Sequence, residues 1–268
     1  MPPTETGLWN GGDAYERYMG RWSRRVAPRF LDWLRPASDL TWIDIGCGTG
    51  VLSSAILDTC APRQVIGVDP SDAFIAAAPE NIGDHRFTTQ CGDGEALPFE
   101  NNEFAAAVSG LVLNFVPDKQ KAVTEMIRVV QPGGAVALYV WDYAGHMQIM
   151  RYFFDAAIEL DTEAREFDDG TNAPICRPAP LEALFNQVGL ENVEVQALDI
   201  VAAFDDFDDY WTPFLGGTGS APKYCASLTA DAQSQLRETI RNRLPTGPDG
   251  EILMAARAWA IKGIAPDL

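Results

Sequence analysis

The stretch Leu40-Thr41-Trp42-Ile43-Asp44-Ile45-Gly46-Cys47-Gly48-Thr49-Gly50 decides the fold. Its first six residues form a short, mostly apolar run of the kind that makes a buried parallel strand. The glycines that follow let the backbone turn sharply and approach a ligand closely. Residues 51–60 read as a helix, whose first N–H groups would point at that ligand. This order of strand, glycine-rich turn and helix predicts a ligand-binding turn at the carboxyl end of a strand in an α/β sheet.

Strand and helix patterns alternate outward from this turn, with short connections between them. We predict parallel strands at residues 40–45, 64–69, 86–91, 104–109 and 135–141, and helices between them at 51–60, 71–78 and 119–130. Such alternation indicates a doubly wound sheet with helices on both faces. Two further strands, at 193–204 and 252–264, bring the expected total to seven, the last of them antiparallel. The fold class is therefore α/β with a mostly parallel, Rossmann-like sheet.

The rest of the chain departs from this alternation and suggests a division of roles. Apolar residues at helical spacing predict an N-terminal helical cap within residues 1–38, and the α/β domain occupies 39–268. Lid insertions are expected near residues 142–180 and 205–228, where the alternation breaks and aromatic residues are frequent. The glycine pair Gly133 and Gly134 reads as a turn before the fifth strand.

Composition narrows the classes of function. The 268 residues carry 20 basic and 38 acidic side chains, for a formal charge of −18. Such a surface repels phosphate backbones, so a nucleic-acid substrate is disfavoured. The five cysteines show no metal-ligand spacing, so no metal is expected. An uninterrupted apolar stretch of membrane-spanning length and a signal-peptide pattern are both missing, and we expect a cytoplasmic protein with reduced thiols.

Three acids at the ends of consecutive strands indicate which ligand the turn binds. The glycine spacing is G-x-G-x-G, whereas dinucleotide folds space theirs G-x-G-x-x-G. Asp44, two residues before Gly46, suits a ligand with an ammonium group better than a pyrophosphate. Asp69 ends the next strand, where an acid can accept hydrogen bonds from both ribose hydroxyls, and Asp93 follows the third, where it can accept from an adenine amino group. S-adenosylmethionine carries all three groups and has no phosphate.

The motifs resemble those of the class I S-adenosylmethionine-dependent methyltransferases, specifically the small-molecule group that includes the ubiquinone and menaquinone C-methyltransferases. The resemblance covers about residues 40–140. It rests on four segments in the family's order: Ile43-Asp44-Ile45-Gly46-Cys47-Gly48-Thr49-Gly50, Gly67-Val68-Asp69-Pro70-Ser71, Gly92-Asp93-Gly94-Glu95-Ala96-Leu97-Pro98-Phe99 and Glu125-Met126-Ile127-Arg128-Val129-Val130-Gln131-Pro132-Gly133-Gly134. One departure is Gly94, where relatives usually carry alanine. The resemblance implies methyl transfer from S-adenosylmethionine to a small molecule. The aromatic residues of the N-terminal helix and the lid segments suit a partly apolar acceptor, or simply pack a helical face.

It also implies a set of cofactor-binding residues. The glycine turn would wrap the methionine end, Asp69 would hold the ribose and Pro70 would lie against the adenine. The segments after the third and fourth strands would edge the adenine and line the sulfonium. Tyr18 and Trp22, in the N-terminal helix, are candidates to cover the cofactor. The full predicted set is Tyr18, Trp22, Asp44, Gly46, Cys47, Gly48, Gly50, Asp69, Pro70, Ser71, Asp93, Gly94, Glu95, Ser109, Gly110 and Leu111.

The acceptor side is less defined. His146, just after the fifth strand, is a candidate general base, and Asn114, past the fourth strand, is a candidate contact to the acceptor. The Asn-Pro-Pro-Tyr type of motif of amino-methylating nucleic-acid enzymes is missing at residues 109–114. Two other functions stay open from the residues alone: a nicotinamide-dependent oxidoreductase, and a protein that binds S-adenosylmethionine without catalysis. Plainer readings also stay open, since Asp69 can cap a helix, Asp44 can merely anchor the turn and Cys47 can simply fill space. The sequence leaves the oligomeric state open.

Overall fold

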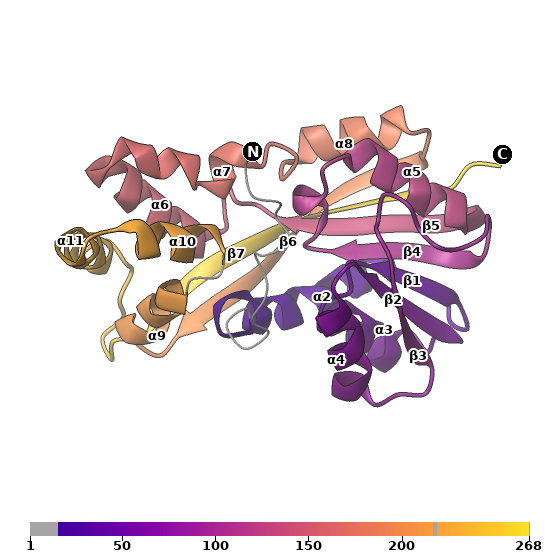
Figure 1. The fold of residues 1–268 in the computed structure, drawn as a ribbon, viewed down its shortest axis with the longest axis horizontal. Coiled ribbons are helices and arrows are strands. Elements are labelled where there is room, and N and C mark those ends of the chain that lie inside the picture. The colour runs from indigo at the N-terminus through magenta and orange to yellow at the C-terminus, as the bar shows by residue number, and fades with distance from the viewer. Residues whose placement is uncertain (1–15, 217–218, 268) are drawn as a thin grey trace. The chain divides into compact units, whose positions relative to one another are not determined.

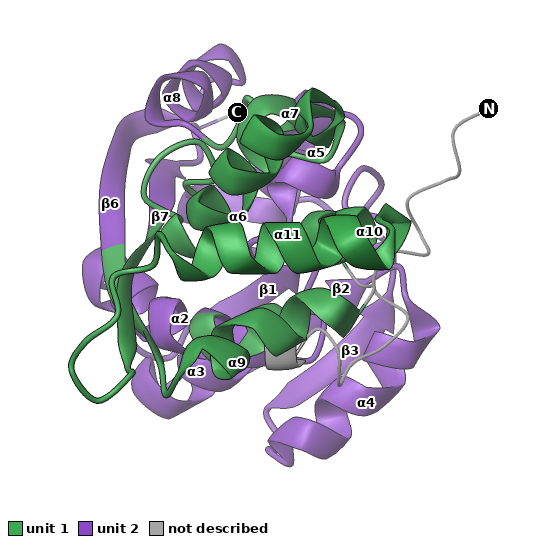
Figure 2. Ribbon diagram, turned by 90° about the vertical axis from the view of Figure 1, so that its left-hand side faces the viewer, with its two compact units in different colours: residues 1–22, 141–176, 199–257 green, residues 23–140, 177–198, 258–268 purple. Residues whose placement is uncertain are grey.

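The computed structural model describes residues 16–216 and 219–267 (Figure 1). The chain divides into two compact units, coloured separately in Figure 2. Unit 1 comprises residues 1–22, 141–176 and 199–257, and unit 2 comprises 23–140, 177–198 and 258–268. Part of the predicted cap, residues 1–15, lies outside the described residues. The predicted lid segments fall in unit 1 almost entirely, together with residues that come before and after them.

A seven-stranded sheet forms the framework, in the order β3-β2-β1-β4-β5-β7-β6. This confirms the predicted fold class. The strands are β1 (Thr41–Ile45), β2 (Gln64–Asp69), β3 (Phe87–Cys91), β4 (Phe104–Gly110), β5 (Val130–Trp141), β6 (Glu191–Phe204) and β7 (Ile252–Ile264). Pairing is parallel from β3 through β5, with Ile43 opposite Ile66 on β2 and Ala107 on β4. Trp42 and Ile43 are fully buried, as expected for a parallel strand covered on both faces.

The strand order reverses beside β1, and this reversal places the glycine turn. The chain moves from β1 out to β3 and then returns to β4 on the other side of β1. Right-handed crossovers in opposite directions put α3 (Val51–Thr59) and α4 (Asp72–Ile82) on one face and α5 (Lys119–Val129) on the other. Between β1 and β4 the two sets of loops separate, and ligands of such folds bind at this point. Helices α2 (Arg21–Leu34) and α8 (Pro178–Gln187) complete the helices of this framework (Figure 1).

Strand β7 runs antiparallel to its neighbours, as predicted. The backbone N–H of Gly133 donates to the carbonyl of Ala265, and that of Asp142 donates to the carbonyl of Arg257. Residue numbers thus rise along β5 while they fall along β7. Strand β6 also runs antiparallel to β7. Lys262 of β7 forms an ion pair with Glu194 of β6, and Arg257 of β7 forms one with Asp199 of β6.

Strand β5 begins earlier than the sequence pattern predicts. Helix α5 ends at Val129, and β5 already includes Gln131 to Gly134. Phe104 pairs with Val130 and Ala106 with Ala135, so β5 takes five residue steps where β4 takes two. A side chain on Gly134 would meet the carbonyl oxygen of Ala105 at 2.6 Å. The glycine pair therefore forms an irregularity inside a strand, not a turn before one, and apolar periodicity cannot reveal such a bulge.

Unit 1 is mainly helical and has an aromatic core. Its helices are η2 (Glu16–Gly20), α6 (Gln148–Leu160), η4 (Thr162–Glu166), α7 (Asp169–Asn172), α9 (Phe207–Trp211), η5 (Thr212–Gly216), α10 (Ser220–Ser227) and α11 (Ala230–Arg241). Phe153 of α6 stacks on Phe214 of η5 with ring centroids 4.6 Å apart. Tyr210 packs edge-on against the same Phe214. These buried rings account for much of the packing of the unit.

Candidate cofactor site

The glycine turn lies at the carboxyl end of β1, where its backbone needs residues without side chains. Gly46, Gly48 and Gly50 all have positive φ, at +73°, +52° and +89°. The N–H groups of Gly46 and Cys47 both donate to the carbonyl of Val68 at the end of β2, at 2.7 and 3.0 Å. A Cβ on Gly46 would lie 2.6 Å from a methyl group of Val112. Conformation and close packing together therefore require glycine at position 46.

Asp44 lies beneath this turn as a buried acid with one oxygen unpaired. Its side chain is 1 % exposed. The hydroxyl of Ser53 donates to Oδ2 at 2.7 Å, whereas Oδ1 is buried and has no hydrogen-bond partner among the described residues. Burial raises the pKa of Asp44 to about 7. An unpaired buried acceptor is costly, so the arrangement suits a ligand that brings a positively charged donor.

Asp69 connects the turn to the start of α4. Its Oδ2 accepts the N–H of Gly48 at 3.1 Å, and its Oδ1 accepts the N–H of Ser71 at 2.9 Å. Burial raises its pKa. The plainer reading of Asp69 as a helix N-cap is wrong, because Ser71 is the N-cap residue of α4 and Asp69 accepts the N–H of Ser71 itself. Each carboxylate oxygen accepts two bonds, so both oxygens retain capacity for the ribose hydroxyls predicted to lie here.

The segment after β3 holds the predicted adenine edge. Oδ1 of Asp93 accepts the N–H of Glu95 at 2.9 Å, and Oδ2 has no partner within the described part of the chain. The Glu95 carboxylate accepts the N–H of Asp118, which is the N-cap residue of α5, at 2.9 Å. A Cβ on Gly94 would meet Ile45 at 3.2 Å, so the alanine usual in relatives would need a small adjustment here. The predicted Pro70 is exposed beside this segment.

The segment after β4 presents backbone, not polar side chains. The Ser109 hydroxyl donates to the carbonyl of Ile45 at 2.7 Å and so fastens β4 to β1. A Cβ on Gly110 would meet the Tyr139 hydroxyl at 2.6 Å. Leu111 is a non-glycine residue with φ of +65°, and such conformations collect at functional sites. Ser109, Gly110 and Leu111 therefore form a closely packed wall at the end of β4, consistent with a role in lining a ligand.

Sequence patterns missed two residues of this site. Ser53, in the first turns of α3, contacts Asp44. Val112, after β4, lies against the Gly46 position. A serine inside a helix and a valine in a loop carry no motif, so neither has a signal in a single sequence. Cys47 is buried, and a Cβ on Gly67 would meet its sulfur at 2.8 Å. Burial raises the pKa of the Cys47 thiol, which fits a neutral residue that fills space.

The remaining candidates lie elsewhere in the fold. Tyr18 and Trp22 are 6 % and 1 % exposed, and their rings pack inside unit 1 against Phe214 and Phe204. The imidazole of His146 is half-exposed, with Nδ1 at 3.7 Å from a carboxylate oxygen of Asp142. The roles of Tyr18 and Trp22 in covering the cofactor, and of His146 as a general base, therefore stay predictions. Asn114 is half-buried in η3 (Leu113–Phe115) of unit 2, just past the β4 wall.

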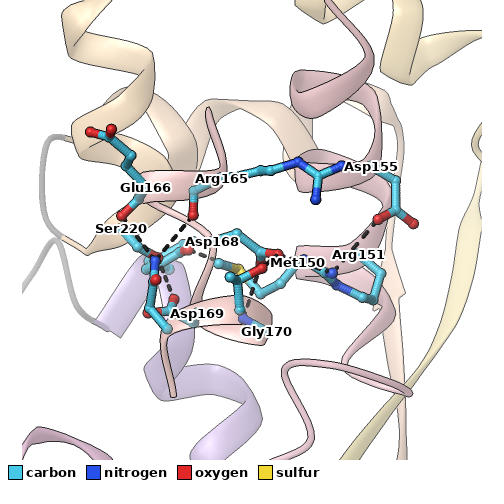
Figure 3. A network of polar contacts seen from close by, with 12 residues as sticks. Met150, Arg151, Asp155, Arg165, Glu166, Asp168, Asp169, Gly170 and Ser220 are labelled. Atoms are coloured by element: carbon cyan, nitrogen blue, oxygen red, sulfur yellow. Dashed lines mark hydrogen bonds and ion pairs between the residues drawn. The ribbon is translucent and has the colours of Figure 1, made fainter. Parts of the chain in front are cut away.

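Two adjacent acids in unit 1 differ sharply in their surroundings (Figure 3). Asp168 pairs with Arg151 and also accepts the N–H of Gly170 at 3.0 Å. Asp169 receives a hydrogen bond from the hydroxyl of Ser220, and no cation among residues 16–216 and 219–267 is bonded to it. Burial raises the pKa of Asp169 to about 6, and the neighbouring Asp168 adds to the shift. One acid of the pair therefore has an arginine partner, and the other resists ionisation.

We predict that Asp169→Asn stabilises the protein at pH 8 and has little effect at pH 4. A carboxyl whose pKa is higher in the folded than in the unfolded state loses stability as pH rises from about 4 to about 6. The asparagine stays neutral and can still accept from Ser220, so it avoids a cost of up to about 3 kcal/mol. Thermal unfolding at both pH values measures this. Asp168→Asn is the matched control and should destabilise at pH 8, because it breaks the ion pair with Arg151. Equal or lower stability of Asp169→Asn at pH 8 would contradict the prediction.

Fold and site together define a class of protein: an α/β protein with a glycine-rich turn and a buried acid at the carboxyl end of β1. Comparison with known proteins agrees. A family model described as a methyltransferase domain matches residues 43–138. An uncharacterized methyltransferase of Mycobacterium tuberculosis is 33% identical over 240 residues, which cover 88% of this chain and 84% of the relative. The chain therefore belongs to the class I S-adenosylmethionine-dependent methyltransferases, and S-adenosylmethionine is its cofactor.

Two further comparisons extend over different parts of the chain. A demethylmenaquinone methyltransferase of Desulfitobacterium hafniense is 39% identical over 102 residues, which cover 36% of this chain and 40% of that protein. This chain thus matches less than half of that relative's length. A solved phosphoethanolamine N-methyltransferase of Haemonchus contortus, in complex with phosphomonomethylethanolamine and S-adenosylhomocysteine, shares the fold with a TM-score of 0.59 and 18% identity. The match covers 98% of this chain and 58% of that one. Family membership selects methyl transfer over the nicotinamide-dependent alternative.

Cys91 offers a chemical test of where the cofactor lies. It is the exposed one of five free cysteines, and its sulfur is 4.0 Å from the carbonyl oxygen of Pro70. Because Pro70 is predicted to lie against the adenine, we expect saturating S-adenosylhomocysteine to slow alkylation of Cys91 several-fold. Partial desolvation and the nearby Asp72 raise the pKa of the thiol, so iodoacetamide labelling followed by mass spectrometry is best run near pH 8. Cys91→Ser controls for other sites, and a rate unaffected by the ligand would place the adenine elsewhere.

Proposed function

We propose that the protein transfers the methyl group of S-adenosylmethionine to a small, partly apolar organic molecule. The single observation that carries the cofactor half of this proposal is the orphaned buried oxygen of Asp44 beneath the glycine turn. Asp69 and Asp93 stand at the ends of the next two strands, where a ribose and an adenine would follow. The bound cofactor supplies an activated methyl group on a sulfonium, which passes to an acceptor in line with the sulfur.

The protein's own residues have separable tasks in this proposal. Asp44 binds the ammonium group of the methionine part, and Asp69 holds the ribose hydroxyls. The wall at Ser109, Gly110 and Leu111 lines the sulfonium and limits access of water to it. The sequence further predicts that Tyr18 and Trp22 cover the cofactor and that His146 and Asn114 contact the acceptor.

Three observations favour a small acceptor over a macromolecule. The formal charge of −18 opposes a nucleic-acid substrate. Aromatic side chains are concentrated in unit 1, in the segments that lie outside the cofactor motifs. Several of them pack against one another, and we infer that others line the acceptor site, because apolar linings are typical of small-molecule sites. The relative from Desulfitobacterium hafniense, which matches 102 residues, is named for a quinone substrate.

The protein's setting is consistent with a reaction inside the cell. The described residues include no helix long and apolar enough to cross a membrane. They also contain no group of acidic, histidine and cysteine side chains that is suited to holding a metal ion. All five cysteines are free thiols, which supports placing the protein in a reducing compartment such as the cytoplasm.

Methyl-labelled S-adenosylmethionine tests the proposal directly. The label is offered together with three kinds of acceptor: a reduced, short-chain demethylated naphthoquinone, a set of small aromatic amines and phenols, and bulk transfer RNA. We expect label in an organic-extractable small molecule and none in RNA. Binding of S-adenosylhomocysteine is measured in parallel by calorimetry. Label in RNA or in protein would contradict the small-molecule proposal, and binding without any transfer would favour the alternative of a cofactor-binding protein without catalysis.

A further inference from the structure

Ser53 is a buried polar residue to which neither the family motifs nor the site prediction assigns a role. It lies in the first turns of α3 and is 0 % exposed. Serine hydroxyls inside helices usually bond back to a carbonyl of the preceding turn. The Ser53 hydroxyl instead donates across to Oδ2 of Asp44 on β1, at 2.7 Å. The bond therefore connects the helix that follows the glycine turn to the acid that precedes it.

This bond makes the two carboxylate oxygens of Asp44 differ. Oδ2 is occupied by Ser53, whereas Oδ1 is buried without a partner among the described residues. A free carboxylate can rotate and share its oxygens among neighbours. With Oδ2 held, the orientation of the carboxylate is set before any ligand arrives, and one oxygen stays available. Preorganisation of this kind reduces the cost of binding.

We propose that Ser53 is a positioning residue for the cofactor: it holds Oδ2 of Asp44 so that Oδ1 receives the ammonium group of the methionine part. The inference rests on the proposed role of Asp44 in that site. It adds that recognition of the amino-acid end is linked to a proton, because Asp44 must be ionised to receive the ammonium. The adenosine end carries no such requirement.

The groups that act on Asp44 determine the direction of this linkage. Burial raises its pKa to about 7, the Ser53 hydroxyl lowers it and the carboxylate of Asp69 on β2 raises it. Cys47, in the glycine turn, is the other titratable neighbour, and its raised pKa keeps it neutral. Affinity for a ligand with an ammonium group should therefore fall as pH drops through about 7. Loss of the Ser53 hydroxyl should move this fall to higher pH.

Two ligands separate this effect from the rest of the site. S-adenosylhomocysteine has the amino-acid part, whereas 5′-deoxy-5′-methylthioadenosine keeps the adenosine and the sulfur and lacks it. Titration calorimetry between pH 6 and pH 8 is carried out with both. For the wild type we expect S-adenosylhomocysteine to bind about tenfold more weakly for each pH unit below 7, because one proton must leave, and the affinity for methylthioadenosine to stay flat. Protonation of Asp69 would weaken both ligands alike, since both carry the ribose.

Variants assign the effect to Ser53. At pH 7, Ser53→Ala should weaken S-adenosylhomocysteine at least fivefold, leave methylthioadenosine within twofold and shift the pH profile upward. Alanine favours helices, so α3 itself should not weaken. Ser54→Ala is the matched control: Ser54 is the next residue of the same helix, and its hydroxyl makes no hydrogen bond among the described residues. Asp44→Asn should reproduce the selective loss and remove the pH dependence.

The outcomes distinguish the inference from the proposed function. Equal losses for both ligands in Ser53→Ala would overturn the positioning role, and flat pH profiles for both ligands in the wild type would overturn the proton linkage, while either result leaves the cofactor site intact. If neither ligand binds the wild type, the proposed cofactor site fails and the inference fails with it. The pH profile is measured on the wild type. It therefore tests the proposed proton linkage even if the Ser53→Ala variant folds poorly.

Discussion

Replacing Asp69 by alanine is expected to weaken the binding of S-adenosylhomocysteine at least tenfold, which corresponds to about 1.4 kcal/mol or more. The acid has two tasks. It is placed to accept the ribose hydroxyls, and hydrogen bonds to a charged group contribute about 1.5–3 kcal/mol. It also accepts the N–H groups of Gly48 and Ser71, so its removal loosens the glycine turn and the start of α4. Calorimetry with the wild type and the variant measures the change.

Thermal unfolding separates these two tasks. Asp69→Ala should also lose about 1–3 kcal/mol of stability without ligand, because two backbone donors lose their partner. Asp69→Asn keeps one acceptor oxygen, so it should recover part of the stability while binding stays weak. Asp72→Ala, which removes an exposed acid three residues along the chain, should change neither. An unchanged affinity in Asp69→Ala would remove this residue from the site.

The second large effect is expected for Gly46→Ala. Alanine at φ of +73° is strained, and its Cβ would lie 2.6 and 2.7 Å from the two methyl groups of Val112. Strain of about 1–2 kcal/mol and overpacking of about 1–3 kcal/mol act together. We expect the variant to lose about 3 kcal/mol of stability and most of its affinity for S-adenosylhomocysteine, because the turn must move to relieve the contact. Chemical denaturation and calorimetry measure the two losses.

Gly48→Ala is the matched control for that experiment. Gly48 also has a positive φ, at +52°, but a Cβ there would meet nothing within 4 Å. Its loss of stability should reflect strain alone and be about half as large. The double variant Gly46→Ala with Val112→Ala should recover the part of the loss that is due to close contact. Equal stability losses for Gly46→Ala and Gly48→Ala would show that Val112 does not restrict the turn.

The success of the fold prediction has a local cause. Most strands of the parallel sheet are short apolar runs, and the crossovers after β1, β2 and β4 are helices, so neighbouring residues carry the signal. The failure at β5 has a non-local cause. Gln131 to Gly134 read as a turn because proline and glycine interrupt an apolar pattern. Their place in a strand depends on the pairing of Val130 with Phe104 and of Ala135 with Ala106 on β4.

Candidate site residues divide in the same way. The acids Asp44, Asp69 and Asp93 are visible in the sequence because strand ends and glycine spacing mark them. The use of Glu95 to hold the N-cap of α5, and of Ser109 to fasten β4 to β1, is not visible, because the partners are distant in sequence. Tyr18 and Trp22 are recognisable as aromatic residues at helical spacing, but their packing against Phe214 and Phe204 is a tertiary fact.

The sequence by itself determined the class of sheet and the glycine turn, and it indicated the cofactor. These depend on short-range features: apolar runs, residues that tolerate positive φ, and acids at fixed distances from them. Only the tertiary structure decided which oxygen of Asp44 is free, why Gly46 admits no side chain and that Ser53 takes part in the site. Those properties arise where α3, the turn and the segment after β4 meet around β1. Burial and hydrogen-bond geometry at such a meeting point depend on several distant segments at once, and no local pattern encodes them.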